Sequence, residues 1–574
     1  MAQQRSLFPG TAPPKTKKRR SSVQKAPASG RKTGRAGGSR RRGAVSPGGA
    51  GSGRARTRAH EMAEKAREIS VSEFFVKNRH LLGFDSLRKS LLSTVKEAVD
   101  NALDACEEAG WLPDIAVEIA PVNGKEDRFR VTVSDNGPGI LPDQIDLVFA
   151  KLLYGSKFHR LRQSRGQQGI GISAAGMYGQ MTTGRPTLIR SRIGADHPAV
   201  EAAVRIDTVK NRPVRVSTRE IQWDRRHGTE VTIELQGRYH KGKGSVSEYL
   251  SQTAIANPHV QILFRGPSNG DPVIHKRATR EMPRAPREIR PHPYGVELGL
   301  LMKMMKSTTA TRLGAFLQND FSRVSPRVAQ EICRLAGLAP SARVKSLEHG
   351  SAEAIHGAIS RVKILNPPTD CLTPIGEDLI RKGLKKEIGE AEFFVSRTRS
   401  PAVYRGNPFQ VEVGMALGGD LPADETVRLL RYANRVPLQY QQGACAMTRA
   451  VNSIDWKNYQ LQHPRGGLPV GPVIMMVHMA SAWVPFTSES KEAVAGYPEI
   501  LRELKLALQD CGRQMQKYLR RRKRVADEMK KRSYIDMYIP HIGQALRDIL
   551  SLNEARTARL VEQLRETLER SRKL

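Results

Sequence analysis

The spacing of apolar residues predicts a chain that mixes helices and strands. From Leu87 to Ala109 the apolar residues recur with a helical period. Six shorter segments alternate apolar and polar residues with the period of two that is typical of strands. They are Ile115–Ile119, Phe129–Val133, Thr187–Arg192, Ala199–Ile206, Val214–Thr218 and Thr229–Leu235. A helix followed by successive strands favours an α+β sandwich over a βαβ array.

The pattern changes after residues 267–293, which are rich in Pro, Arg and Gly and predict a domain boundary. Two short helices are predicted beyond this segment, Thr311–Phe321 and Pro326–Ala336. Ser325 is placed to cap the second helix, and Gly337 is placed to end it. These features predict a small helical domain.

The last part of the chain combines strands with long helices. Two strands are predicted first, Phe409–Ala416 and Pro472–Val477. Residues 499–574 contain very few Pro and Gly residues, which predicts long helices. Near their end, leucines recur every four residues on one helical face, at Leu560, Leu564 and Leu568. This stripe either contacts a partner or packs on the chain's own preceding domain.

Composition indicates a multidomain protein with a polyanionic partner. The chain has 574 residues, of which 39% are hydrophobic, and no apolar run reaches the roughly 18 residues of a membrane span. Five scattered cysteines predict neither a disulfide framework nor a zinc ribbon. Lys and Arg number 94 against 57 Asp and Glu, a net charge of +37. Such an excess favours binding to nucleic acid.

The first sixty residues contain 16 Lys and Arg and no acidic residue, interleaved with Gly, Ala, Ser and Pro. This composition predicts a disordered tail at residues 1–65. Lys15 to Arg20 is consistent with a nuclear address or with a non-specific nucleic-acid arm. The remainder of the chain still carries 21 more basic than acidic residues, so the tail does not account for the charge alone.

The first candidate chemical motif lies on the predicted helix. Glu97, Asn101 and Asp104 follow one another at helical spacing and share one face. A carboxylate one turn before a carboxamide suits water activation beside a metal-bound phosphate group. Taken alone, the same three residues also describe a solvated polar stripe.

Two glycine-rich segments follow the helix. Asp135 precedes Gly137-Pro138-Gly139 directly after a predicted strand, where a buried carboxylate can accept a hydrogen bond from a base. The second segment opens a predicted helix, a position where backbone N–H groups can surround phosphates. It consists of Gly166, Gln167, Gln168, Gly169, Ile170, Gly171, Ile172 and Ser173. Each segment alone is weak support for a nucleotide site.

In this order and spacing, the three motifs resemble the ATP-binding fold shared by gyrase, heat-shock chaperones, mismatch-repair ATPases and histidine kinases. The resemblance implies a GHKL (Bergerat) ATPase sandwich that binds ATP and Mg²⁺. It implies that Glu97 is the general base, that Asn101 holds magnesium and that Asp135 reads adenine, while the glycine-rich lid covers the phosphates. A kinase is disfavoured, because kinases of this fold generally lack the water-activating Glu.

Further segments resemble the B subunits of topoisomerase VI. Leu153 to Phe158 is similar to their YGSKF segment, which implies that Ser156 and Lys157 line the nucleotide pocket. Phe316 to Leu338 resembles their helix-two-turns-helix insert. Ile454 to Tyr459 resembles their transducer segment, which implies that Lys457 reaches the γ-phosphate. From the residues alone, Lys457 is a surface lysine beside a core tryptophan.

The resemblance, which runs from about residue 66 to 530, and the composition of the two ends together predict five segments along the chain. They are a disordered basic tail (1–65), a GHKL ATPase domain (66–290), a helix-two-turns-helix domain (291–365), an α/β transducer domain (366–530) and a C-terminal helical extension (531–574). The helix-two-turns-helix element is equally consistent with DNA contact and with a structural spacer.

The implied function is that of the ATP-hydrolysing subunit of a type IIB DNA topoisomerase. No Asp-x-Asp pair occurs in the sequence, so DNA cleavage is expected to come from a separate A subunit with a catalytic tyrosine. We expect an A2B2 heterotetramer acting on DNA duplexes, located in the cytoplasm at the nucleoid, or in the nucleus of a eukaryote. The alternative is a mismatch-repair-like or chaperone-like clamp that closes on ATP without strand passage.

Overall fold

The computed structural model describes residues 58, 73, 75 and 77–571, except 123, 156–159, 167–168, 269 and 390. The predicted tail at residues 1–65 lies outside the described residues apart from Arg58. Residues 69–574 form one compact unit, to which the following description applies. None of its described helices is both long enough and apolar enough to cross a membrane.

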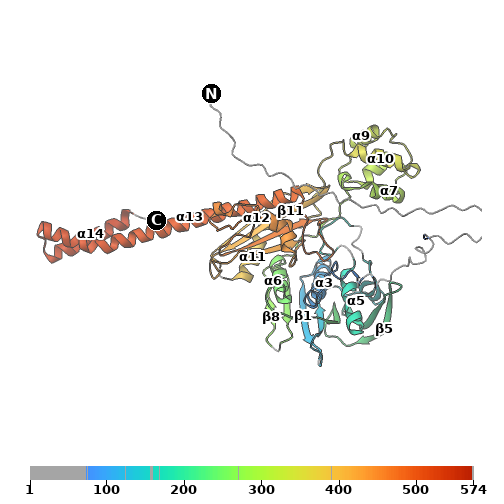
Figure 1. Ribbon diagram of the computed structural model, residues 1–574, viewed down its shortest axis with the longest axis horizontal. Helices are drawn as coiled ribbons and strands as arrows, with labels where there is room; N and C mark the ends of the chain where they lie inside the picture. Colours follow the sequence, from blue (N-terminus) through green and yellow to red (C-terminus); the bar gives the residue numbers. More distant parts are fainter. Residues whose placement is uncertain are drawn as a thin grey trace, which may run out of the picture. The chain divides into compact units, whose positions relative to one another are not determined.

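A twisted sheet with helices on one face forms the first half of this unit (Figure 1). Its strand order is β5-β4-β3-β6-β2-β1-β7-β8, and every neighbouring pair is antiparallel except β1 and β7. The strands are β1 (Asp114–Pro121), β2 (Arg128–Ser134), β3 (Thr187–Arg192), β4 (Ala199–Asp207), β5 (Arg212–Ile221), β6 (Gly228–Gln236), β7 (Gln261–Arg265) and β8 (Val273–His275). The six predicted strands are confirmed as β1 to β6.

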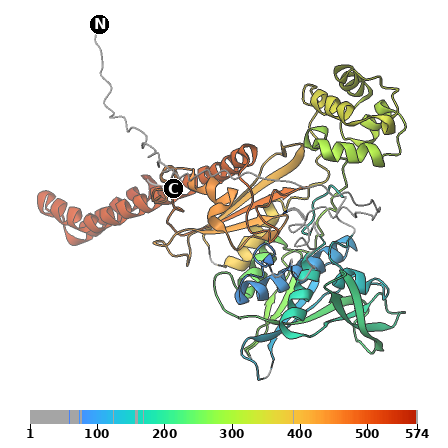
Figure 2. The same cartoon turned by 45° about the vertical axis from the view of Figure 1, so that its right-hand side comes forward.

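Four helices accompany this sheet: α3 (Leu87–Glu108), α4 (Ile145–Ala150), α5 (Gly171–Thr183) and α6 (Val246–Ala256). Helix α3 begins at Ser86, whose hydroxyl accepts a hydrogen bond from the N–H of Lys89. Helices α3 and α5 lie side by side and contact the sheet at β2 and β6 (Figure 2). Alternate residues of β2, such as Val131 and Val133, are buried beneath them. The core of the sandwich thus lies between one face of the sheet and these helices.

The predicted small helical region has its own hydrophobic core. Ser325 accepts a hydrogen bond from the N–H of Val328, and Gly337 ends the helix with a φ of +68°. Both roles were predicted, and only glycine adopts this φ without strain. The helices are α7 (Leu298–Ser307), α8 (Leu313–Asp320), α9 (Pro326–Ala336) and α10 (His349–Ile359), with short 3-10 turns η1 (Pro293–Gly295) and η2 (Val344–Ser346).

A second sheet, of six strands, follows. Its order is β10-β11-β14-β12-β13, and β9 pairs with β11. The elements are α11 (Glu377–Ile388), β9 (Phe393–Thr398), β10 (Ala402–Tyr404), β11 (Asn407–Leu417), β12 (Arg428–Ala433), β13 (Val436–Pro437), η3 (Gln442–Ala444), α12 (Ala446–Asn452), η4 (Trp456–Tyr459) and β14 (Val473–Ser481). The two predicted strands are confirmed as β11 and β14. All nine residues of β14 are buried, as expected for a central strand.

Two long helices end the described chain, α13 (Pro498–Leu550) and α14 (Glu554–Ser571). The first part of α13 packs on β9, β10 and β11, and α14 lies against α13 (Figure 1). Gly512 allows the ring of Tyr459 to pack closely on α13. Leu560 and Leu564 are half-buried, and Val561 packs at Gly543 of α13. Part of the predicted leucine stripe therefore packs within this chain.

Candidate active site

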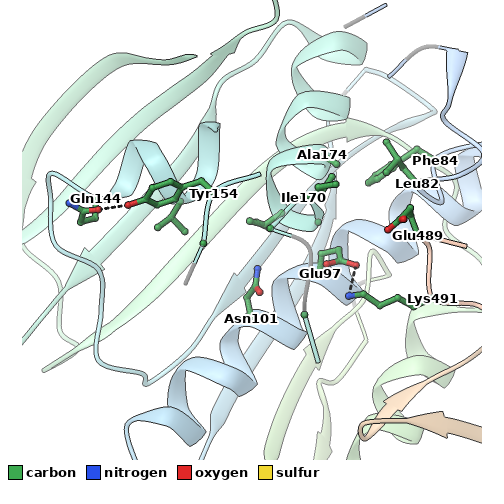
Figure 3. A pocket seen from close by; sticks show the side chains of 16 residues that line it. Leu82, Phe84, Glu97, Asn101, Gln144, Tyr154, Ile170, Ala174, Glu489 and Lys491 are labelled. Carbon is green, nitrogen blue, oxygen red and sulfur yellow. Dashed lines mark hydrogen bonds and ion pairs between the residues drawn. The ribbon is translucent and has the colours of Figure 1, made fainter. Parts of the chain in front are cut away.

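A cavity of about 570 Å³ lies beside α3 and the glycine-rich segment (Figure 3). Most of its lining comes from three distant parts of the sequence: α3, residues 144–174 and a loop at residues 489–491. The charged and polar lining residues are Glu97, Asn101, Gln144, Tyr154, Glu489 and Lys491. An ATP-sized substrate requires a concave site of this kind, with few and well-placed polar groups.

Glu97 stands at the centre of this cavity. Its Oε1 lies 3.7 Å from Nζ of Lys491, and its side chain is 19% exposed. A Cβ at Gly171 would overlap the Glu97 carboxylate, so a larger residue at this position would require the Glu97 side chain to move. The structure therefore places the predicted base and the predicted lid in direct contact.

Asn101 lies one turn after Glu97 and also lines the cavity (Figure 3). It is exposed, so its amide oxygen is accessible to a ligand. No group of three or more His, Cys, Asp or Glu residues suited to a metal ion occurs among the described residues. This arrangement fits Mg²⁺, which typically takes only one or two protein ligands and completes its shell with substrate phosphates and water.

Lys491 reaches the cavity from a loop after β14. The isolated bridge between Phe486 and Val494 closes this loop, and Lys491 adopts a φ of +54° within it. Such a φ is costly for a lysine and typically occurs where function requires it. Lys491 is only 6% exposed. Burial lowers its pKa, but the carboxylates of Glu97 and Asp100 outweigh burial and raise the pKa overall, so the lysine is held charged.

The prediction that Lys457 reaches the phosphates is not supported by its position. Trp456 beside it is fully buried and donates from Nε1 to the carbonyl of Val451, which fixes η4 in the core of the second sheet. Lys457 itself is exposed and does not line the cavity. Lys491, and not Lys457, is the lysine that lines the cavity. The reading of Lys457 as a surface lysine beside a core tryptophan is the one that the structure supports.

Asp104, the third residue of the predicted helix motif, also does not line the cavity. Asp104 is buried and forms a 2.8 Å ion pair with Arg165, away from the cavity lining. Asp100 instead lies near Glu97, with its Oδ1 accepting a hydrogen bond from Tyr249. Burial raises the pKa of Asp100 to about 6, although the charges of Lys491 and Lys96 oppose this shift.

Asp135 lies at the end of β2, as predicted, and is buried. Its Oδ1 accepts hydrogen bonds from the N–H groups of Gly137 and Thr229, at 2.8 and 3.2 Å. Burial raises the pKa of Asp135 to about 6, although these two hydrogen bonds lower it. Asp135 is not among the side chains that line the cavity.

The predicted lid contributes five residues to the cavity lining: Gly166, Gly169, Ile170, Gly171 and Ile172. Ser173 does not line it, because its side chain is buried and its hydroxyl is placed to donate to the carbonyl groups of Val148 and Lys151. The predictions for Gln167, Gln168, Ser156 and Lys157 lie outside the described residues.

Several lining residues were not predicted. Tyr154 donates from its hydroxyl to Gln144 at 2.9 Å, and Glu489 accompanies Lys491 on its loop. Lys491 had one detectable signal: it lies in the polar run Ser488-Glu489-Ser490-Lys491-Glu492 shortly after an apolar strand. Polar loops at strand ends commonly carry functional residues.

The segment that leads into the lid is held by residues far along the chain. Gln163 exchanges two hydrogen bonds with the backbone of Thr373, at 2.7 and 3.1 Å. Asn434, in the turn between β12 and β13, donates to the carbonyl of Ser164 at 2.9 Å. The start of the lid is thus tied to the second sheet.

Two family models match this chain. The model described as "Histidine kinase-, DNA gyrase B-, and HSP90-like ATPase" matches residues 87–238. The model described as "Topoisomerase VI B subunit, transducer" matches residues 367–531. The first match covers α3, the glycine-rich segment and most of the first sheet, and confirms the predicted GHKL fold.

Curated relatives match most of the chain. The B subunit of type 2 DNA topoisomerase 6 from Methanococcoides burtonii is 50% identical over 493 residues, covering 86% of this chain and 79% of the relative. The protein of the same name from Methanosarcina barkeri is 49% identical, with the same coverage. That of Archaeoglobus fulgidus is 47% identical and covers 88% and 83% of the two chains. These matches do not favour the alternative of a mismatch-repair-like clamp. The chain belongs to the family of B subunits of type 2 DNA topoisomerase 6.

Proposed function

We propose that this chain is the ATP-binding and ATP-hydrolysing subunit of a type IIB DNA topoisomerase, in which ATP-driven dimerisation gates the passage of one duplex through another. The observation that carries this proposal is the meeting of Glu97 on α3 with Lys491 from the loop after β14. A base on one domain that is paired with a cation from another can couple hydrolysis to movement between domains.

Glu97 is the general base in this proposal. It activates the water that attacks the γ-phosphate, and it acts best when its carboxylate is not engaged by a cation. Lys491 is close enough to Glu97 to pair with it, and it is held charged in a buried site. A γ-phosphate in the cavity competes with Glu97 for Lys491, so substrate binding itself releases the base.

Asn101 would hold Mg²⁺ through its amide oxygen. When bound, this ion supplies charge neutralisation at the phosphates. We also propose that Asp135 accepts a hydrogen bond from the adenine amino group, as in the ATPases of this fold. Its buried place at the end of β2, next to the Gly137 turn, supports that role.

We propose domain limits of 66–290 for the ATPase domain, 291–365 for the helix-two-turns-helix domain, 366–530 for the transducer and 531–574 for the C-terminal extension. Separate hydrophobic clusters in the first three of these segments support the division. A basic tail at residues 1–65 completes the assignment.

The partners are proposed from the chemistry of the chain and from the names of its relatives, which are called B subunits of a DNA topoisomerase. A net charge of +37 suits binding to DNA duplexes. A separate A subunit supplies DNA cleavage, and two copies of each subunit form an A2B2 assembly. We place this assembly in the cytoplasm at the nucleoid, or in the nucleus of a eukaryote.

The second part of α13 is a proposed surface for the A subunit. Tyr534, Met537 and Tyr538 are 58 to 63% exposed there. Exposed apolar side chains gathered on one helix are typical of a protein-binding surface.

The test of the function is relaxation and decatenation of DNA when this chain is mixed with its A subunit. We expect both reactions to require ATP and to stop when either subunit is omitted. ATP hydrolysis without strand passage in the complete mixture would instead support the clamp.

A further inference from the structure

A second cavity, of about 310 Å³, lies on the other side of the segment that leads into the lid. Residues 160 and 162–165 of this segment line the second cavity, whereas the next residue, Gly166, lines the nucleotide cavity. Five arginines line it against three acidic residues. The arginines are Arg160, Arg162, Arg165, Arg284 and Arg435, and the acids are Asp104, Glu107 and Glu108.

The three acidic residues are engaged by two of these arginines. Arg165 forms ion pairs of 2.8 and 2.6 Å with Asp104 and Glu107, and Arg162 pairs with Glu108 at 2.8 Å. The five arginines of the cavity therefore carry more positive charge than its three carboxylates can neutralise.

Arg435 is the buried one of the three lining arginines that are not paired with these carboxylates. It is 4% exposed, and its Nη1 has no hydrogen-bond partner among the described residues. Its Nη2 donates to the carbonyl of Pro374, at 3.1 Å. A buried guanidinium without a carboxylate partner is unfavourable unless an anion reaches it. Burial lowers the pKa of Arg435, although the charges of Glu107 and Glu412 oppose this shift.

The backbone holds Arg435 in place. Asn434 and Arg435 both have positive φ, +49° and +68°, in the two-residue turn between β12 and β13. Glycine is usual at the second of these positions, so an arginine there is strained. The N–H of Arg435 donates to Nε2 of His478, whose Nδ1 bonds the fully buried carboxylate of Glu412 at 2.8 Å. This support fixes the backbone of Arg435, and the bond from Nη2 to the carbonyl of Pro374 holds its guanidinium.

We propose that this cavity binds a phosphate-type oxyanion, such as phosphate or pyrophosphate, through Arg435 together with Arg160 and Arg284. Arg160 and Arg284 are less buried than Arg435, so they can supply charge at the mouth of the cavity. Bidentate donation from guanidinium groups matches the oxygens of such an anion. The bound anion joins the segment before the lid to the turn of the second sheet, and so stabilises their contact.

The test measures phosphate and pyrophosphate binding to the full chain by calorimetry, with the nucleotide cavity saturated by a non-hydrolysable ATP analogue. We expect saturable binding to wild type, and affinity at least about tenfold lower in Arg435→Gln and in the Arg160→Ala/Arg284→Ala double variant. The double variant leaves the buried Arg435 in place, so it still tests anion binding if Arg435→Gln fails to fold. The control is Arg327→Ala/Arg334→Ala on α9, two exposed arginines outside the cavity.

A crystal soaked in tungstate gives a second readout, with an anomalous peak expected beside Arg435. Repeating the titration with a saturating DNA duplex separates two sources of the anion. Phosphate binding that survives the duplex assigns the cavity to a free anion, and its loss assigns the cavity to a DNA backbone phosphate. The proposal is overturned if wild type shows no saturable binding, or if the variants bind phosphate as well as wild type does.

Discussion

Nζ of Lys491 lies 3.7 Å from Oε1 of Glu97, although 394 residues separate the two in sequence. One belongs to the helix that opens the ATPase sandwich and the other to a loop after the central strand of the second sheet. Their contact brings the loop after β14 to the helix that carries the proposed base.

The first prediction contrasts two lysines. Lys491→Ala is expected to bind ATP but to hydrolyse it at least about tenfold more slowly, because a charge that stabilises the phosphates is lost. Lys457→Ala is expected to hydrolyse ATP within about twofold of wild type, because Lys457 lies outside the cavity. Steady-state ATPase assays without DNA measure both. The reverse ranking would return the phosphate-sensing role to Lys457.

Glu97→Ala tests the base. The variant is expected to bind ATP and to lose turnover by at least roughly 10²-fold, as expected when a general base is removed. Glu118→Ala is the matched control, since Glu118 is an exposed carboxylate on β1 of the same domain. Binding is followed by calorimetry and turnover by phosphate release. Near-normal turnover in the Glu97 variant would show that another group activates water.

Asp135→Asn tests the base-recognition role. An amide at this position presents its oxygen and N–H groups differently from a carboxylate, so the hydrogen bond to adenine is lost or opposed. We expect no measurable ATP binding by calorimetry. Circular dichroism is needed beside it, because Asp135 also accepts hydrogen bonds from Gly137 and Thr229. A folded variant with unchanged affinity would place the adenine elsewhere.

Asp100 predicts a pH dependence of stability. Its pKa is raised to about 6 in the folded chain, above its ordinary value of 3.8, so the folded state binds this proton more tightly than the unfolded state does. The resulting stabilisation is fully present below the unfolded pKa and is lost as pH rises through about 6. As pH rises from about 4 to about 6, the melting temperature of wild type should therefore decrease relative to that of Asp100→Asn. A constant difference would mean that Asp100 is already ionised at the lower pH.

The C-terminal helices provide the last prediction. Tyr534→Ser/Tyr538→Ser is expected to weaken, by at least about tenfold, the association with the A subunit, because a hot-spot aromatic pair is lost. Removal of residues 545–574 should also weaken it and leave the ATPase domain folded. Leu300→Ser, at an exposed leucine of α7, is the control. Size-exclusion chromatography of the mixed subunits reports the outcome, and an intact complex in both variants would move the contact surface elsewhere.

Local patterns predicted much of the fold. The strands β1 to β6, the helix α3 and the capped helix α9 each carry their own signal: alternation, helical period, or a serine and a glycine at the two ends. Strands β7 and β8 and helices α6 and α11 were not predicted. The two strands are short, and β7 pairs in parallel with β1, which is distant in sequence.

The site residues likewise divide into those with a local sequence signal and those that depend on distant parts of the chain. Glu97, Asn101 and the glycines of the lid lie within one stretch of chain with recognisable spacing, so the sequence identified them. Lys491 enters from a distant loop, and its only local signal is the polar run around it, which is weaker than the motif that Lys457 resembled. Asp104 shares the helical face of Glu97 and Asn101, but helical spacing does not show what a face contacts, and Asp104 pairs with Arg165.

The hydrogen bonds of Gln163 and Asn434 bear on how the chain can be divided in the laboratory. A fragment that ends near residue 290 would keep the whole nucleotide cavity except its loop at 489–491. It would also leave Gln163 and the carbonyl of Ser164, at the base of the lid, without their partners at Thr373 and Asn434. Inhibitors or nucleotides screened on such a fragment would therefore bind beside a lid whose mobility differs from that in the intact chain. Their measured affinities would not transfer to the whole enzyme.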